Sequence, residues 1–210
     1  MKTEVVDAGS VAGRRWAVET LRSGGLIVFP TDTVYGLAAD PWDEKAVRSL
    51  YEVKERPGDL PIPLLLSDAD QLDRVAVLPE RCQGLPERYW PGGLTLVVPK
   101  ADTISEAISG RATVALRVPD HPVARCLIRE AGGVLAVTSA NVSGHSSPVT
   151  AREVEVQLGG RIPLILDGGP CPIGQASTIV DCSVSPPHLL RRGAISEGDL
   201  RAAIGAIGLA

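Results

Sequence analysis

Short runs in which nearly every residue is apolar are the feature that most constrains the fold of this chain. They occupy residues 26–29, 62–66, 113–118 and 134–138, and the last two flank a predicted helix over about 121–131. A strand that is apolar on both faces must be covered on both faces, which is typical of a sheet packed between helices. The pattern therefore predicts an α/β fold.

Polar residues that can cap helices separate these runs. The expected helices are 11–22 after Ser10, 44–55 after Asp43, about 79–88, 151–158 after the capping box of Thr150 and Glu153, and a last one after Ser196. Further strands are expected near 34–38, 94–98, 163–166, 177–181 and 188–191. No repeat, long linker or composition shift interrupts the sequence, so we expect a single domain over residues 1–210.

Charge and composition exclude several classes of protein. The net charge of −4 gives no general attraction to nucleic acid, and only seven of the 210 residues are aromatic. No apolar run is long enough to span a membrane, and the N-terminus lacks the apolar stretch of a signal peptide, so a cytoplasmic protein without membrane contact is expected. The four cysteines have no zinc-site spacing and are interpreted as buried thiols.

Polar clusters follow three of the predicted strands. They are Thr31-Asp32-Thr33, Thr138-Ser139-Ala140-Asn141 and Ser177-Thr178. Ligands of α/β sheets collect at strand ends, and hydroxyl groups suit phosphate oxygens. The alternative is that these are ordinary turn and cap residues.

Basic residues supply candidate anion contacts. Lys54 and Arg56 lie at a helix end, where Pro57 could let both side chains converge on a polyanion, although cations there are also commonly solvated. Arg117 ends an apolar strand, so its burial demands a ligand or a fixed carboxylate. Arg191 follows another strand and is either a phosphate contact or a solvated residue.

Familiar catalytic motifs are missing. The sequence has no Gly-Lys dipeptide, GxGxxG or GxSxG, and its three histidines lack metal-site spacing. Ser139 has no nearby base that would make it a nucleophile.

Six motifs in order nevertheless resemble the YrdC/TsaC family of threonylcarbamoyl-AMP synthases. They are GGLIVFPTDTVYGLAAD, KERP, WPGGLT, TVALRVPDHP, TSANVSG followed by SP, and STIVD followed by LLRRGA. The resemblance covers about residues 10–196. It implies a single-domain twisted mixed sheet with flanking helices and a concave basic pocket, in the short form without the extra C-terminal domain of longer members.

The resemblance also implies a reaction and its partners. L-threonine, bicarbonate and ATP, with Mg²⁺, would give threonylcarbamoyl-AMP and pyrophosphate. The product would pass to a separate tRNA threonylcarbamoyl transferase complex that modifies adenosine 37, and weak tRNA binding is compatible with this role.

The resemblance also implies roles for individual residues at the matching motif positions. Lys54, Arg56, Ser139 and Asn141 match catalytic positions that face the nucleotide phosphates. Further matches to ATP contacts are Thr113, Ser147 and Arg191, and the threonine site is matched by Thr33, Tyr35, Arg117 and Ser177. Leu60 and Leu65 stand where many members of the family have Asn and His. One side-chain contact to ATP and one to threonine are therefore not assigned to a residue of this sequence.

The implied chemistry agrees with the residues. Attack of an amine on bicarbonate, and of the carbamate on the α-phosphate, requires positioning and charge neutralisation more than a protein nucleophile. Arg117 would hold the threonine carboxylate as a fork, while Mg²⁺ would be held by phosphates and water, with Asp32 as an outer contact. Five rings beside the motifs, at positions 29, 35, 51, 89 and 90, are expected to wall the pocket.

Two other classes of function remain open at this stage. An RNA-binding module would bind tRNA or ribosomal RNA without ATP, and would favour a positive charge and exposed aromatic residues. A transferase that uses carbamoyl phosphate would share the anion pocket without needing ATP.

Overall fold

The computed structural model describes residues 2–209 apart from 56, 57 and 59. The α-helices are α1 (Val11–Arg22), α2 (Glu44–Lys54), α3 (Gly84–Tyr89), α4 (Pro122–Glu130), α5 (Ala151–Leu158) and α6 (Glu197–Ile204), and two short 3₁₀ helices cover Ala69–Arg74 and Glu80–Cys82. The strands are β1 (Glu4–Asp7), β2 (Ile27–Phe29), β3 (Gly36–Ala39), β4 (Leu64–Leu66), β5 (Leu94–Pro99), β6 (Thr113–Arg117), β7 (Val134–Ser139), β8 (Leu164–Asp167), β9 (Thr178–Asp181), β10 (His188–Arg191) and β11 (Gly208–Leu209).

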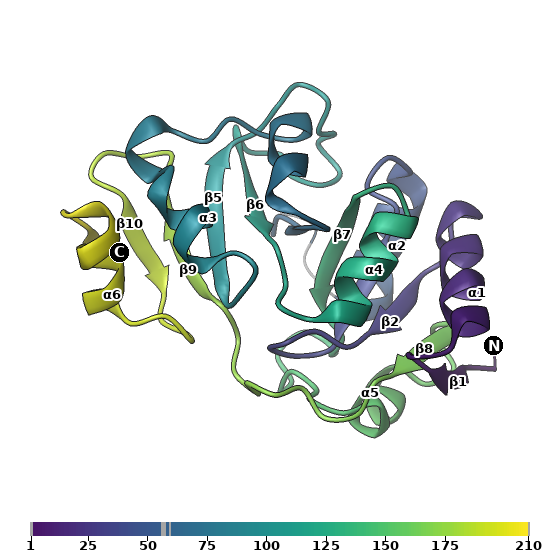
Figure 1. The fold of residues 1–210 in the computed structure, drawn as a ribbon. Coiled ribbons are helices and arrows are strands. Elements are labelled where there is room, and N and C mark those ends of the chain that lie inside the picture. Colours follow the sequence, from purple (N-terminus) through teal and green to yellow (C-terminus); the bar gives the residue numbers. More distant parts are fainter. Residues whose placement is uncertain (1, 56–57, 59, 210) are drawn as a thin grey trace.

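All of these strands join one twisted sheet, which runs across the molecule in Figure 1. Their order is β1-β8-β2-β3-β7-β4-β6-β5-β9-β10-β11, with parallel pairs such as β4 with β6 and antiparallel pairs such as β3 with β7. The expected mixed α/β sheet with flanking helices is therefore confirmed. The N-terminus lies beside β1 and the C-terminus beside α6, at opposite sides of the molecule (Figure 1).

Successive strand residues point into two separate cores. One face of the sheet packs against α2, α3, α5 and α6 through residues such as Leu37, Leu50 and Leu200. The other face packs against α1 and α4 through residues such as Phe29 and Leu127. This second layer also includes Leu65 on β4 and Val137 on β7, which mark where the covered part of this face meets the site described below.

Side-chain caps begin four helices where the sequence places them. The hydroxyl or carboxylate oxygens of Ser10, Asp43, Thr150 and Ser196 accept hydrogen bonds from backbone N–H groups of α1, α2, α5 and α6. The helix expected over about 79–88 is instead split into the 3₁₀ turn Glu80–Cys82 and α3. The edge strands β1 and β11 were not predicted.

The interpretation of the cysteines is confirmed for three of the four. Cys82, Cys171 and Cys182 are buried thiols, whereas Cys126 is half-buried and its Sγ donates to Glu130 Oε1 at 3.3 Å. Cys126 departs from the expectation because it lies on the outer side of α4. No helix in the described part of the chain is both long and apolar enough to cross a membrane.

Candidate functional site

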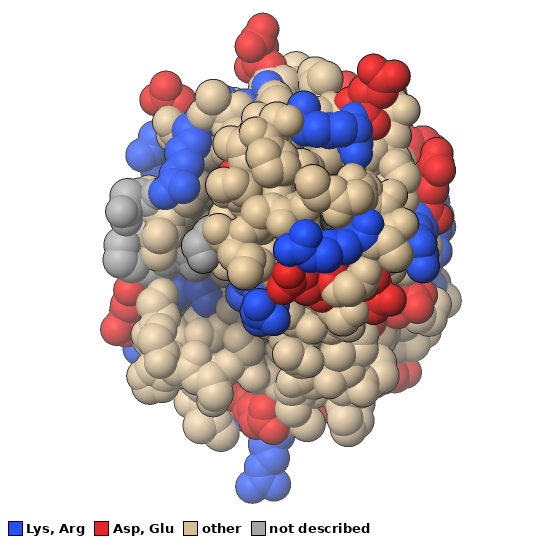
Figure 2. Space-filling view, turned by 90° about the vertical axis from the view of Figure 1, so that its left-hand side faces the viewer, with Lys and Arg blue, Asp and Glu red and all other residues tan. Residues whose placement is uncertain are grey.

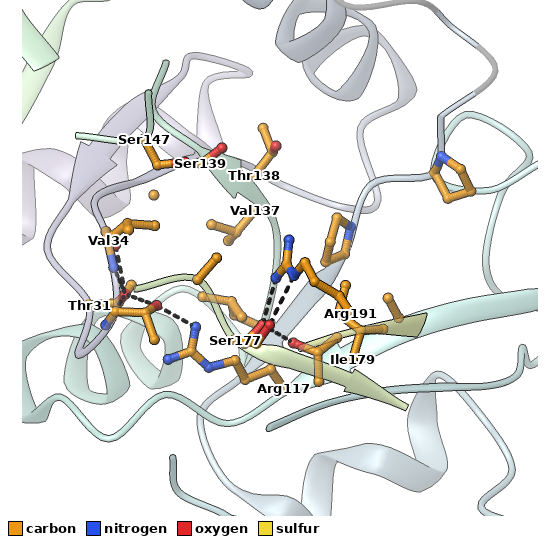
Figure 3. Close-up of a pocket in the computed structure, with 18 of the residues that line it drawn as sticks. Thr31, Val34, Arg117, Val137, Thr138, Ser139, Ser147, Ser177, Ile179 and Arg191 are labelled. Atoms are coloured by element: carbon orange, nitrogen blue, oxygen red, sulfur yellow. Dashed lines mark hydrogen bonds between the residues drawn. The ribbon is translucent and has the colours of Figure 1, made fainter. Parts of the chain in front are cut away.

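A cavity of about 340 Å³ lies on the face of the sheet that also carries α1 and α4. Its floor is apolar and comes from five neighbouring strands, through Leu65, Val97, Ala115, Val137 and Ile179. Polar side chains line its sides, and Figure 3 shows Arg117 and Arg191 approaching the same space from β6 and β10. Among the described residues that line the cavity, these two arginines carry the charge.

The turn after β2 is held by the hydroxyl of Thr31. Thr31 Oγ1 accepts hydrogen bonds from the backbone N–H groups of Thr33 at 3.2 Å and Val34 at 3.3 Å, and lies 2.7 Å from the Val34 carbonyl oxygen, to which it donates. The Thr33 hydroxyl in turn accepts a 2.7 Å hydrogen bond from Arg117 Nη1. The polar turn predicted from the sequence thus positions an arginine from a distant strand.

Arg117 is buried and has the fixed carboxylate that its burial requires. Its Nη2 forms an ion pair with Asp32 Oδ1, and its Nε donates to the Gly92 carbonyl oxygen at 2.8 Å. Burial lowers the pKa of the Arg117 guanidinium, and the Asp32 carboxylate opposes this shift. The Asp32 carboxylate, for which an outer metal contact was expected from the sequence, is 2% exposed and pairs with Arg117 through Oδ1, and the metal contact stays a prediction.

Arg191 and Ser177 form the opposite side of the cavity. Arg191 donates from Nε to the Ser177 carbonyl oxygen at 2.9 Å and from Nη2 to Ser177 Oγ at 3.0 Å. Ser177 Oγ also shares a 2.7 Å hydrogen bond with Thr95 Oγ1. Burial, and then the like charge of Arg117, lower the pKa of Arg191, so this side favours an added anion.

The segments that carry Arg191 and Ser177 touch through a glycine. A Cβ at Gly193 would lie 2.5 Å from the Ser177 carbonyl carbon and from the Thr178 nitrogen. Both atoms belong to the backbone, so no side-chain rotation can relieve the clash. Only glycine lets the two segments approach this closely.

Gly193→Ala should therefore push the β10 end away from Ser177. We expect the free energy of unfolding to fall by roughly 1–3 kcal/mol, as in other overpacked sites, together with weaker binding of anions in the cavity. Thermal denaturation and ligand titration would measure both effects. Gly110→Ala is the matched control, because no atom of the described residues beyond its own chain neighbours lies within 4 Å of a Cβ at Gly110. Equal behaviour of the two variants would contradict the steric argument.

Lys54 ends α2 and is 1% exposed, so the alternative of a solvated helix end is wrong. Its ammonium donates to the carbonyl oxygen of Ser139, to that of Asn141 at 2.5 Å and to Asn141 Oδ1 at 3.5 Å. Lys54 thus ties the loop after β7 to α2. Arg56, its predicted partner in a polyanion clamp, lies outside the described residues, so the clamp stays a prediction.

The structure brings most of the other predicted site residues together. Thr33, Tyr35, Ser139, Ser147 and Ser177 line the same cavity as the two arginines. The hydroxyl of Tyr35 does not face a ligand, because it donates to the Gly169 carbonyl oxygen at 2.7 Å and so fixes the turn after β8. Burial raises the pKa of this hydroxyl.

Asn141 and Thr113 do not line the cavity in this structure. The Asn141 amide donates to the carbonyl oxygens of Val142 at 2.8 Å and His145 at 3.0 Å, and so braces the loop from within. Thr113 shares a face of β6 with Ala115 and Arg117 but lies further along the strand.

The two leucine positions differ in their placement. Leu65 forms part of the cavity floor, whereas Leu60 is 40% exposed and does not line the cavity. The proposed wall of aromatic residues is wrong for four of the five rings, since Tyr35 is the one among them that lines the cavity. Trp90, for example, is buried in the core and donates to the Leu94 carbonyl oxygen at 2.7 Å.

Sequence reasoning missed Thr95 and the role of Asp32. Thr95 is a polar residue within the apolar strand β5, which was a usable signal. Asp32 was recognised as part of the turn, but its pairing with a residue 85 positions away has no local signature.

Acidic and basic residues are interspersed on the face that carries β10 and α6, as Figure 2 shows. Arg192 and Arg201, for example, both pair with Glu197. This face therefore does not present a continuous basic surface of the kind that binds a nucleic-acid backbone.

Residues 19–193 match the family model Sua5/YciO/YrdC, whose description is "Telomere recombination". The chain belongs to the Sua5/YciO/YrdC family. This confirms the resemblance stated from the sequence motifs, which are spread over the same residues.

Two curated relatives of this chain are named threonylcarbamoyl-AMP synthase. The chain is 45% identical over 194 residues to the threonylcarbamoyl-AMP synthase of Bacillus subtilis, covering 91% of this chain and 56% of that protein. It is 36% identical over 188 residues to the threonylcarbamoyl-AMP synthase of Vibrio vulnificus, covering 87% of this chain and 100% of that protein. The chain thus spans little more than half of the first relative.

A solved structure of the same family is closely similar. The Sua5 protein of Pyrococcus abyssi, crystallised with L-threonine, superposes with a TM-score of 0.95 at 38% identity. The superposition covers 99% of this chain and 63% of that one.

Proposed function

We propose that this chain forms L-threonylcarbamoyl-AMP and pyrophosphate from L-threonine, bicarbonate and ATP. The observation that carries the proposal is the single cavity that presents both Arg117, held by Asp32 and Thr33, and Arg191, which has no carboxylate partner among the described residues. One guanidinium suits the carboxylate of an amino acid and the other suits phosphate oxygens. The names of the relatives and the threonine complex of the Pyrococcus protein support the same assignment.

In this proposal the cavity residues bind and orient the substrates. Arg117 and Thr33 hold the threonine carboxylate and its surroundings, with Ser177 nearby. Ser139, Ser147 and Arg191 face the phosphates of ATP. Lys54 fixes the end of β7 at Ser139 and the loop that follows it. Arg56, Asn141 and Thr113 complete the nucleotide site once ATP is bound.

Two bonds form in sequence. The neutral amine of threonine attacks the carbon of bicarbonate and gives a carbamate with loss of water. A carbamate oxygen then attacks the α-phosphorus of ATP, and pyrophosphate leaves with the electron pair of the broken P–O bond. These steps need alignment and charge neutralisation, which arginines and hydroxyl groups provide without a protein nucleophile.

Magnesium is proposed to accompany ATP. Among the described residues no group of three or more His, Cys, Asp or Glu side chains could hold a metal ion, and Asp32 is occupied by Arg117. This donor set fits an ion held by triphosphate oxygens and water rather than by a protein cage. When bound, the ion would neutralise charge on the departing pyrophosphate.

The product is a reactive mixed anhydride, so we propose that a tRNA threonylcarbamoyl transferase complex in the cytoplasm consumes it. Weak tRNA binding by this chain would ease that transfer.

The proposal is tested by pyrophosphate release from ATP with each substrate omitted in turn. We expect release to require threonine and bicarbonate together, and mass spectrometry to detect threonylcarbamoyl-AMP. Equal release without threonine would contradict the proposal. Salt-sensitive RNA binding without ATP turnover would favour an RNA-binding module, and turnover of carbamoyl phosphate would favour the transferase alternative.

A further inference from the structure

The two arginines in the cavity differ in their electrostatic surroundings. Arg117 is paired with the Asp32 carboxylate, so this pair carries no net charge. Arg191 is bonded to Ser177 alone among the described residues, and its charge is uncompensated. One cavity therefore contains a neutralised cation and an unneutralised one.

Burying the Asp32 carboxylate at this position costs folding free energy. Asp32 is 2% exposed, and its Oδ2 atom has no hydrogen-bond partner among the residues that the structure describes. A buried carboxylate oxygen without a partner costs free energy, and replacing a buried ion pair by neutral residues is often neutral or stabilising. Stability alone therefore does not account for Asp32.

Asp32 is also held firmly in place. Its carbonyl oxygen accepts a 2.9 Å hydrogen bond from the Ile173 backbone N–H, and the Thr31 hydroxyl fixes the turn around it. The carboxylate thus presents one oxygen to Arg117 from a rigid backbone.

The contacts of Arg117 leave a matched pair of donors. Within the described part of the chain, its side-chain hydrogen bonds run from Nε to Gly92, from Nη1 to Thr33 and from Nη2 to Asp32. A guanidinium has five N–H groups, so one remains on each terminal nitrogen after these contacts are counted. Two such donors match the two oxygens of a single carboxylate.

We propose that Asp32 is a positioning residue that orients and neutralises Arg117, so that this part of the cavity selects a zwitterionic amino acid over free inorganic anions. The inference rests on the proposed function. A zwitterion brings a carboxylate without net charge, so the neutral Arg117–Asp32 pair accepts it readily. Phosphate brings at least one net negative charge, which the nearby Asp32 carboxylate repels.

The test compares the wild-type protein with Asp32→Asn by calorimetric titration with L-threonine and, separately, with inorganic phosphate. We expect the dissociation constant for threonine to rise about tenfold and that for phosphate to fall by a similar factor, because the arginine becomes both less well oriented and uncompensated. If Asp32 had a purely structural role, the variant would bind both threonine and phosphate more weakly. That result would overturn the proposal.

Asp68→Asn is the matched control. Asp68 pairs with Arg125 and Arg129, neither of which lines the cavity, whereas Asp32 pairs with Arg117, which does. We expect both dissociation constants to stay at wild-type values in this variant, and a shift as large as that of Asp32→Asn would overturn the proposal.

Asp32→Glu keeps the inference testable if Asp32→Asn fails to fold. Because it retains the charge, its dissociation constant for phosphate should stay at the wild-type value, and phosphate binding tightened about tenfold would contradict the proposal. A wild-type protein that binds no threonine would instead refute the proposed function. The exclusion of phosphate by Asp32 would then be decided by the phosphate titrations of these variants.

Discussion

Arg117→Ala should lower threonine-dependent pyrophosphate release by about 30- to 3,000-fold. Truncating one member of a buried charge pair costs about 2–5 kcal/mol, and each 1.4 kcal/mol is a factor of ten. The variant loses the fork proposed for the amino-acid carboxylate and leaves Asp32 buried without its cation. Steady-state kinetics with threonine and ATP varied separately would show whether the KM for threonine carries the larger change.

Arg125→Ala provides a matched control for this variant. Arg125 likewise donates from Nε to a backbone carbonyl oxygen, that of Ser67, and pairs with a carboxylate, that of Asp68, but it does not line the cavity. It should therefore leave the KM for threonine unchanged. An unchanged KM in Arg117→Ala would place the amino acid elsewhere.

The double variant Arg117→Ala/Asp32→Asn separates stability from activity. It removes the buried carboxylate that the single variant leaves unpaired, so we expect it to recover thermal stability. It should not recover turnover, because the fork is still missing. Recovery of turnover would show that Arg117 acts only through folding.

Lys54→Met should lower both stability and activity. The substitution keeps the length of the side chain but leaves the carbonyl oxygens of Ser139 and Asn141 without this donor. Each unsatisfied buried group costs about 1–3 kcal/mol, so we expect a loss of roughly 2–6 kcal/mol in unfolding free energy. In a domain of this size each kcal/mol corresponds to about 2–4 °C of melting temperature. Turnover should fall at least about tenfold, because the end of β7 at Ser139 and the loop after it lose their anchor.

Lys45→Met on the same helix controls for the loss of a lysine charge, because Lys45 is exposed. It should melt and turn over like the wild type. A Lys54→Met protein with wild-type melting temperature and no turnover would show that Lys54 acts as a phosphate ligand rather than as an anchor of the loop.

Much of the fold could be predicted because its signals are local. A cap such as Ser10 or Asp43 satisfies N–H groups within its own helix, and an apolar strand such as β2 is buried whatever its neighbours are. The edge strands β1 and β11 have no such signal, since their pairing with β8 and β10 depends on residues far away in sequence. The predicted helix near 79–88 breaks at Gln83, where the 3₁₀ turn ends and α3 begins.

In the site, too, the features that depend on nearby residues could be predicted, and those that depend on residues far away in sequence could not. The need of Arg117 for an anionic partner, a ligand or a fixed carboxylate, followed from its place at the end of an apolar strand. The identity of that partner depended on the fold placing the turn after β2 beside the end of β6, although three strands separate β2 from β6 in the sheet. Lys54 was predicted from its motif, yet its burial depends on the loop after β7 folding over it. The four rings that were wrongly placed at the cavity are neighbours of site motifs in sequence only.

The residues that line the cavity run from Thr31 to Arg191, and they come from seven of the strands as well as the loops between them. No shorter stretch of the polypeptide contains a working subset, because Arg117 depends on the turn after β2 and Ser177 depends on the end of β10. During synthesis the site stays incomplete until Arg191 has left the ribosome. A bound substrate therefore draws its free energy from contacts distributed over the whole sheet, and raises the melting temperature of the entire molecule rather than that of one part.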